Sequence, residues 1–119
     1  MVILITGASR GIGREIAVKL ANNGNRIIAN YNKSEEQANI LKQENNNIEI
    51  YKADVSRREE VHKMITDVIQ KYGKIDVLIN NAGISEEKMF IDVTDADWNK
   101  MINVNLYSVF CVTQEVLPS

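Results

Sequence analysis

The chain has 119 residues, of which 45% are hydrophobic and 25% are charged, and its formal net charge is −2 at pH 7. This length favours a single domain over residues 1–119, and the acidic balance excludes the positive surface that nucleic acids and anionic membranes attract. No apolar run approaches the ~20 residues needed to cross a bilayer, no signal peptide is indicated, and the single cysteine cannot form an internal disulfide. We therefore expect a soluble cytoplasmic protein, and we assign it no metal site.

Strand-like and helix-like segments alternate along the whole chain. Short apolar runs predict strands at residues 2–6, 26–31, 48–52 and 75–80. Helical periodicity predicts helices at residues 11–23, 35–45, 57–72 and from about 95 toward 117. Capping patterns begin at Ser34, Ser56 and Thr94, and Gly24 and Gly73 are expected to end the helices before them.

This alternation, with short loops, predicts an α/β fold. Right-handed crossovers then give a Rossmann-type parallel sheet, flanked by helices, with the spatial strand order 3-2-1-4. The run Val77-Leu78-Ile79 predicts that the fourth strand is buried on both faces. A complete doubly wound sheet has two such halves, so we expect the fold to be truncated after the fourth strand and the helix that follows it.

The last predicted helix is apolar on two sides. One side carries Trp98, Ile102, Leu106, Val109, Phe110 and Leu117, and the other carries Met101, Val104, Val112 and Val116. A helix with two apolar sides is usually buried on two sides. One side would cover the sheet, and the other would contact a second subunit or, alternatively, the rest of a larger domain. The unpaired edge of the fourth strand offers a second place for a homo-oligomer contact.

A glycine-rich turn, Thr6-Gly-Ala-Ser-Arg-Gly-Ile-Gly13, joins the first strand to the first helix. Glycine permits tight backbone geometry and close approach, and the N–H groups and dipole of the following helix face an anion. The spacing is G-x-x-x-G-x-G, in the strand–turn–helix context that a dinucleotide pyrophosphate requires. The turn therefore predicts a nucleotide site, and the alternative is a purely structural turn.

Four motifs in this order resemble those of the short-chain dehydrogenase/reductase superfamily. They are the glycine turn, Asp54-Val55 after the third strand, Asn80-Asn81-Ala82-Gly83 after the fourth, and Asn105-Leu106 in the last helix. Together they span the whole chain. The glycine turn and the Asn-Tyr stretch after the second strand are most similar to those of bacterial 3-oxoacyl-[acyl-carrier-protein] reductases.

The resemblance implies a nicotinamide cofactor held at the carboxyl ends of the strands. The residues that it places at the cofactor are Gly7, Ser9, Arg10, Gly11, Ile12, Gly13, Asn30, Tyr31, Asp54, Val55, Asn81, Ala82 and Gly83. The carboxylate of Asp54 could accept a hydrogen bond from the adenine amino group, or it could simply help to start the next helix.

The end of the second strand favours NADP over NAD. Members that bind NAD place there an acidic residue that accepts from the ribose 2′-hydroxyl, but this chain has Asn30 and Tyr31. Arg10 and Lys33 could supply positive charge to a 2′-phosphate. Arg10 could instead be a solvated surface cation.

Asn105 lies in the middle of a helix, where asparagine is unfavourable unless its side chain has another partner. The resemblance assigns it to a catalytic tetrad, and the alternative is a polar residue that bends the helix. The other groups of that chemistry include a Tyr-x-x-x-Lys pair, and none of the four tyrosines is followed by lysine at that spacing. The 119 residues alone are therefore expected to be inactive, as part of a longer protein.

The resulting prediction is an NADP-dependent oxidoreductase that reduces a small-molecule or acyl-carrier-bound carbonyl, most closely a 3-oxoacyl thioester. The alternative is a non-catalytic nucleotide-binding or self-assembling fragment, because the Tyr-x-x-x-Lys pair is absent. Met89 and Phe90, in the segment 84–92, could line a substrate entrance or pack beneath a loop.

Overall fold

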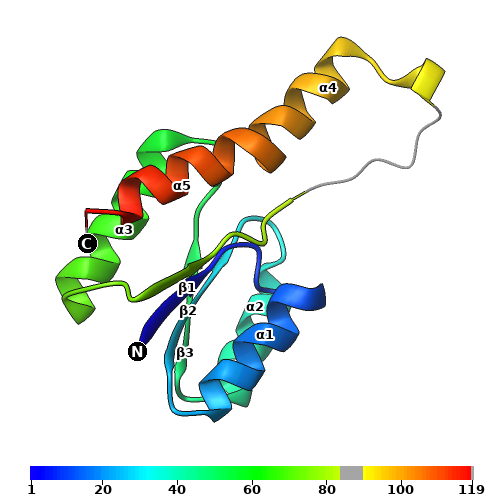
Figure 1. Ribbon diagram of the computed structural model, residues 1–119. Coiled ribbons are helices and arrows are strands. Elements are labelled where there is room, and N and C mark those ends of the chain that lie inside the picture. Colours follow the sequence, from blue (N-terminus) through cyan, green and yellow to red (C-terminus); the bar gives the residue numbers. More distant parts are fainter. Residues whose placement is uncertain (84–89, 119) are drawn as a thin grey trace.

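The computed structural model describes residues 1–83 and 90–118, and a parallel four-stranded sheet lies at its centre (Figure 1). The strands are β1 (Val2–Ile5), β2 (Arg26–Tyr31), β3 (Ile48–Lys52) and β4 (Val77–Ile79), in the order β3-β2-β1-β4. The connecting helices are α1 (Gly11–Asn22), α2 (Glu35–Glu44) and α3 (Arg58–Tyr72). In the register, Ile3 of β1 is paired with Ile27 of β2 on one side and with Val77 of β4 on the other. The predicted Rossmann-type order is confirmed.

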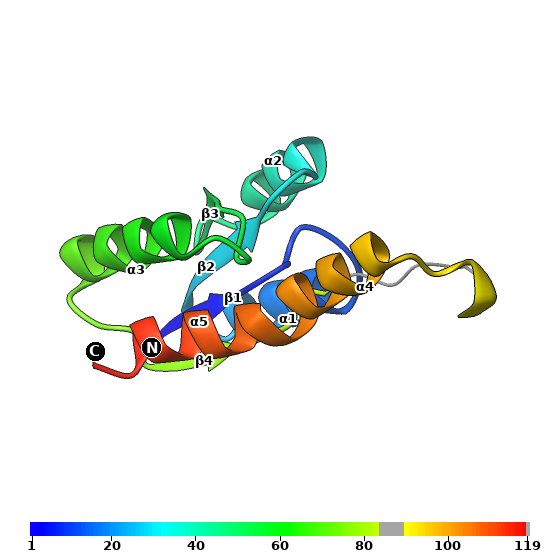
Figure 2. The same cartoon turned by 90° about the horizontal axis from the view of Figure 1, so that it is seen from above.

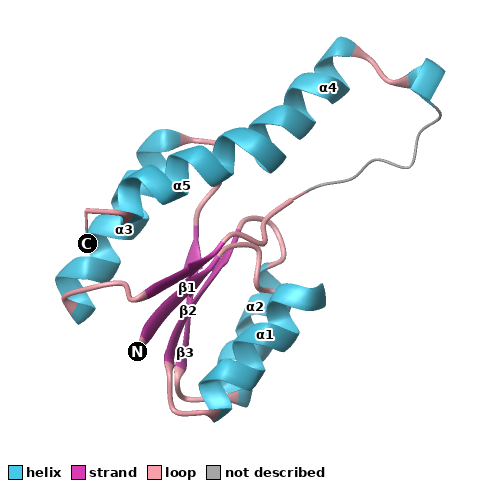
Figure 3. Cartoon of the chain, in the orientation of Figure 1, coloured by secondary structure: helices cyan, strands magenta, loops and turns pink. Residues whose placement is uncertain are grey.

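Helices cover both faces of the sheet (Figure 3). Side chains alternate between the faces of a strand, so Ile3 and Ile5 pack with α1 and α2, whereas Leu4 packs with α3 and the last helix. All three side chains are fully or almost fully buried. The continuous apolar runs of β1 and β2 are therefore explained by burial on both faces.

The C-terminal helical segment continues along one path from Asp95 to Val116 (Figure 2). It comprises α4 (Asp95–Ile102), the π-helical turn η2 (Asn103–Tyr107) and α5 (Ser108–Val116), after a short 3-10 turn, η1 (Phe90–Asp92). The predicted cap at Thr94 is confirmed, because its side chain accepts from the Asp97 N–H and the Asp97 side chain accepts from the Thr94 N–H. α5 packs against the sheet and α3, whereas α4 has no buried residue and projects past the sheet (Figure 1).

The two apolar sides of this helix have different environments. Val112 and Val116 are buried in the core, whereas Leu106 and Phe110 are 64% and 55% exposed. One side therefore covers the sheet, as predicted, and the other is open in the part of the chain that the structure describes.

Two predicted caps are wrong. Ser34 precedes α2 but its side chain makes no capping hydrogen bond. The Ser56 hydroxyl donates to the Asp54 carboxylate instead, and α3 begins two residues later, at Arg58. The nearby carboxylate competes for the hydroxyl that the local pattern assigns to the helix.

The prediction for the fourth strand is also wrong in extent and burial. β4 covers three residues, and Val77, Leu78 and Ile79 are half-buried. Within the described residues β4 pairs with β1 alone, so it is an edge strand. One side of an edge strand has no neighbouring strand to shield it.

Candidate functional site

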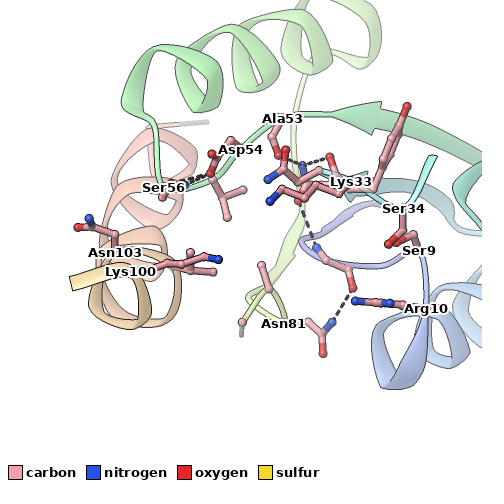
Figure 4. A pocket seen from close by; sticks show the side chains of 18 of the residues that line it. Ser9, Arg10, Lys33, Ser34, Ala53, Asp54, Ser56, Asn81, Lys100 and Asn103 are labelled. Carbon is pink, nitrogen blue, oxygen red and sulfur yellow. Dashed lines mark hydrogen bonds between the residues drawn. The ribbon is translucent and has the colours of Figure 1, made fainter. Parts of the chain in front are cut away.

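A cavity of about 890 Å³ lies at the carboxyl edge of the sheet, where open α/β sheets bind ligands (Figure 4). Its walls are the turn after β1, the end of β2, the segment after β3, the loop after β4, and one side of α4 and η2. All residues predicted to bind the cofactor line this cavity except Ile12 and Gly13. The topology thus brings together segments that are far apart in the sequence.

Two glycines in the turn after β1 adopt left-handed backbone conformations. Gly7 has φ +62°, and a Cβ placed on it would lie 2.8 Å from the Ala82 Cα. Gly11 has φ +65°, and a Cβ there would meet nothing within 4 Å. Gly7 is therefore required by packing as well as by conformation, whereas Gly11 leaves open space at the cavity wall.

Gly13 lies where the first turn of α1 passes close to the residues that follow β1. A Cβ at Gly13 would lie 2.8 Å from the Gly7 carbonyl oxygen and would overlap the Asn81 amide, so the close approach is to the turn and to the loop after β4. Ile12, 71% exposed, points away from the core and is not part of the cavity wall.

The N-terminus of α1 opens at the cavity without a side-chain cap. Arg10 is the N-cap residue, it makes no capping hydrogen bond, and the first turn contains no acidic residue. Arg10 and Gly11 both line the cavity. The first N–H groups of a helix have no partner within the helix, and with the helix dipole they favour an anion.

Asn30 links the ends of three strands. Its side-chain oxygen accepts from the Gly7 N–H at 3.2 Å, and its side-chain nitrogen donates to the Ala53 carbonyl at 3.0 Å. The side chain is 2% exposed. Asn30, predicted as a cofactor residue, therefore holds the glycine turn and the end of β3 in place from beneath the cavity.

Thr6 connects the glycine turn to the loop after β4. Its hydroxyl oxygen accepts from the N–H groups of Asn81 and Ala82, both at 3.0 Å, and the Asn81 side chain donates to the Gly7 carbonyl at 2.9 Å. The Asn81 side chain thus ties the loop after β4 to the turn after β1. The role of Thr6 was not predicted, although a hydroxyl residue at the end of an apolar strand is a visible signal.

The Asp54 carboxylate is oriented by Ser56. One oxygen, Oδ1, accepts from the Ser56 N–H at 3.0 Å and from its hydroxyl at 2.6 Å. The Asp54 N–H in turn donates to the Glu60 carboxylate at 3.0 Å. The side chain therefore has a fixed direction at the cavity wall, and it can still accept a hydrogen bond from a ligand amino group.

Around the end of β2, cations outnumber acidic side chains. Arg10 and Lys33 line the cavity, and Asp54 is the one acidic residue among the described lining residues. The acidic residue next to Tyr31, Glu35, accepts from the Tyr31 hydroxyl at 3.4 Å and does not line the cavity. Burial, and then the adjacent Glu35 carboxylate, raise the pKa of Tyr31, so its hydroxyl stays neutral.

One wall of the cavity was not predicted. It is the side of α4 and η2 that carries Ala96, Asn99, Lys100, Asn103 and Val104. Their spacing of three and four residues is that of one helix face. The pattern is visible in the sequence, but only the direction of the helix shows that this face points to the cavity.

Asn105 lies in the π turn, outside the cavity wall but next to it. A Cβ placed on Gly83, which does line the cavity, would be 3.1 Å from the Asn105 Oδ1. π turns occur frequently at functional sites. The helix is locally distorted at this asparagine, which fits both interpretations of the residue.

Other kinds of site are not indicated in the described part of the chain. Residues 1–83 and 90–118 contain no helix long and apolar enough for a membrane span, and no group of three or more potential metal ligands. Of the expected entrance segment, Met89 lies outside the described residues, and the structure gives no description of the Phe90 side chain.

Comparisons with known proteins agree with this geometry. The family model described as "short chain dehydrogenase" matches residues 1–119. The chain is 39% identical to a 3-oxoacyl-[acyl-carrier-protein] reductase of Staphylococcus epidermidis over 97% of its own length and 49% of that protein. It is 38% identical to the Thermotoga maritima protein of the same name, over 98% of its own length and 49% of that protein. A mutant Serratia marcescens short-chain dehydrogenase/reductase superimposes with a TM-score of 0.91 at 27% identity, covering 98% of this chain and 49% of that one. The chain thus spans about half the length of these relatives.

Proposed function

Because the chain belongs to the short-chain dehydrogenase family, we propose that its cavity binds NADP in an oxidoreductase that reduces a carbonyl group. The uncapped N-terminus of α1, opening beside Gly7 and Gly11, is the observation that carries the proposal. It offers backbone N–H groups and a positive dipole end to a phosphate, at a turn with open space in front of it.

The residues present fit a dinucleotide. The turn from Gly7 to Gly11 would hold the pyrophosphate, and Asp54 and Val55 would flank the adenine. The loop from Asn81 to Gly83 would face the ribose, because its small residues let a ligand approach the backbone. When bound, the nicotinamide of NADPH supplies a hydride to a carbonyl carbon. The chain's own residues bind and orient the cofactor.

The choice of NADP rests on charge at the end of β2. Arg10 and Lys33 line the cavity, and the end of β2, where an acidic residue would accept from a ribose 2′-hydroxyl, carries Asn30 and Tyr31. A 2′-phosphate would therefore meet cations without repulsion.

A 3-oxoacyl thioester is the proposed substrate, since two relatives are named as 3-oxoacyl-[acyl-carrier-protein] reductases. Asn105 is the one proposed catalytic residue in this chain.

The second candidate function is nucleotide binding without catalysis. It applies to residues 1–119 taken alone, because they contain no Tyr-x-x-x-Lys pair. NADPH oxidation with an acetoacetyl thioester by the full-length protein would support the first function, and binding of NADPH to that protein without turnover would contradict it.

Loss of either cation should reduce discrimination between the two cofactors. Arg10→Met and Lys33→Met are each expected to weaken NADPH binding about tenfold and leave NADH binding within about twofold, because only NADPH carries the 2′-phosphate. Calorimetric titration of the full-length protein measures both. Lys42→Met is the control, an exposed lysine on α2 outside the cavity. Equal losses for NADPH and NADH would contradict this assignment.

We also propose that a second copy of the protein covers the exposed apolar side of α4 and α5. Leu106, Phe110 and Leu117 are more than half exposed along this side, and contiguous apolar surface of this kind marks interfaces. A contact through the edge of β4 is the alternative.

Leu106→Glu is expected to convert the full-length protein to a smaller species, because the interface would have to bury an unpaired charge. Sedimentation velocity measures the mass. Ile40→Glu, at an exposed isoleucine on α2, should keep the mass of the wild type. An unchanged mass for Leu106→Glu, or a monomeric wild type, would contradict the proposed surface.

A further inference from the structure

Lys100 reaches the cavity from the wall that α4 and η2 form. It lies on α4, whereas Arg10 and Lys33 come from the turn after β1 and the loop after β2. In Figure 4, the Lys100 side chain extends from α4 into the cavity, on the side where Asp54 and Ser56 lie. The cavity therefore has cations on two opposite sides.

These three cations differ from six other described cations that are paired, and from Lys19, Arg26, Lys42 and Lys52, which form no ion pair with a described residue either but lie outside the cavity. Arg14, Arg57, Arg58, Lys63, Lys71 and Lys74 each form an ion pair with a described carboxylate. Arg10, Lys33 and Lys100 form no ion pair with any residue in the ranges 1–83 and 90–118. Among the described residues, the cavity is thus lined by three cations without an ion pair and by one carboxylate, in a chain whose net charge is −2.

The nearby carboxylate does not neutralise Lys100. Asp54 makes no ion pair with it, and the Oδ1 atom of Asp54 is held by Ser56. Packing does not account for the lysine either, because α4 has no buried residue and its contacts are chiefly with η2. An anionic ligand would satisfy the charge of Lys100 and would connect α4 to the sheet side of the cavity.

We propose that Lys100 is a further cofactor-binding residue, whose ammonium group donates to a phosphate of the bound dinucleotide from the α4 side of the cavity. This inference rests on the proposed dinucleotide site. The phosphate is either the 2′-phosphate or the pyrophosphate, and both present the same anionic oxygens to an ammonium group.

Calorimetric titrations of the full-length protein with NADPH, NADH and 2′,5′-ADP test the proposal. Lys100→Met is expected to weaken NADPH binding about tenfold, as loss of a charge-assisted hydrogen bond predicts. Lys100→Arg should retain affinity to within about threefold, and Lys42→Met should bind as the wild type does. The difference between Lys100→Met and wild type should shrink as salt is raised.

The three ligands identify the phosphate. A loss confined to NADPH and 2′,5′-ADP assigns Lys100 to the 2′-phosphate, and an equal loss for NADPH and NADH assigns it to the pyrophosphate. Unchanged affinity of Lys100→Met for all three ligands would overturn the inference while leaving the proposed function intact. If Lys100→Arg lost as much affinity as Lys100→Met, the inference would also be overturned, because the effect would then not depend on the positive charge. A wild type that binds none of the ligands would overturn the proposed function, and the inference with it.

Discussion

Gly11→Ala is expected to weaken NADPH binding by about 10- to 100-fold, the effect of forcing a methyl group into a fitted contact. A Cβ at Gly11 meets no protein atom within 4 Å, so it would project into open space at the wall of the cavity. That space is where the proposed pyrophosphate approaches the backbone. Calorimetric titration of the full-length variant with NADPH measures the loss.

Gly24→Ala separates the effect on binding from the strain of the backbone. Gly24 has φ +89° and equally open surroundings, but it lies after α1, away from the cavity. Both substitutions should lower the free energy of unfolding by about 1–2 kcal/mol, because both place a side chain in a left-handed conformation. Only Gly11→Ala should lose NADPH affinity, and equal affinities in the two variants would place the cofactor elsewhere.

Asn30→Ala is expected to lower the free energy of unfolding by about 1–3 kcal/mol, since it leaves a buried backbone carbonyl and a partly buried backbone N–H without their partner. These groups are the Gly7 N–H and the Ala53 carbonyl, which the Asn30 side chain joins across the ends of three strands. Denaturant unfolding of the full-length protein, followed by circular dichroism, measures the change.

Asn32→Ala is the matched control for Asn30. Asn32 is two residues away, exposed, and also lines the cavity, but no hydrogen bond of its side chain is found among the described residues. Its replacement should change the free energy of unfolding by less than about 0.5 kcal/mol. If Asn30→Ala were as mild as Asn32→Ala, the side-chain bridge beneath the glycine turn would not be a stabilising contact.

Local patterns predicted the order of the sheet and most of the cavity. The apolar runs of β1, β2 and β3 and the glycines that follow helices α1 and α3 are short-range signals, and parallel strands bring their carboxyl ends to one edge. Asp54 and the residues from Asn81 to Gly83 could therefore be placed together although they come from different loops.

What the sequence did not predict depends on long-range contacts. Ser56 has a capping pattern, but its hydroxyl donates a hydrogen bond to the Asp54 carboxylate, and the helix begins two residues later. Lys100 lies on a helix face that is recognisable from its spacing, yet its position at the cavity follows from the direction of α4. Thr6 accepts from a loop 75 and 76 residues away in the sequence.

Titration of the purified full-length protein with NADPH and with NADH tests the central claim most directly. The cavity described here predicts saturable binding of one NADPH per chain, with NADPH at least about tenfold tighter than NADH because of the cations that line the site. Absence of saturable binding for both cofactors would contradict the dinucleotide site, and tighter binding of NADH would contradict the assignment of NADP.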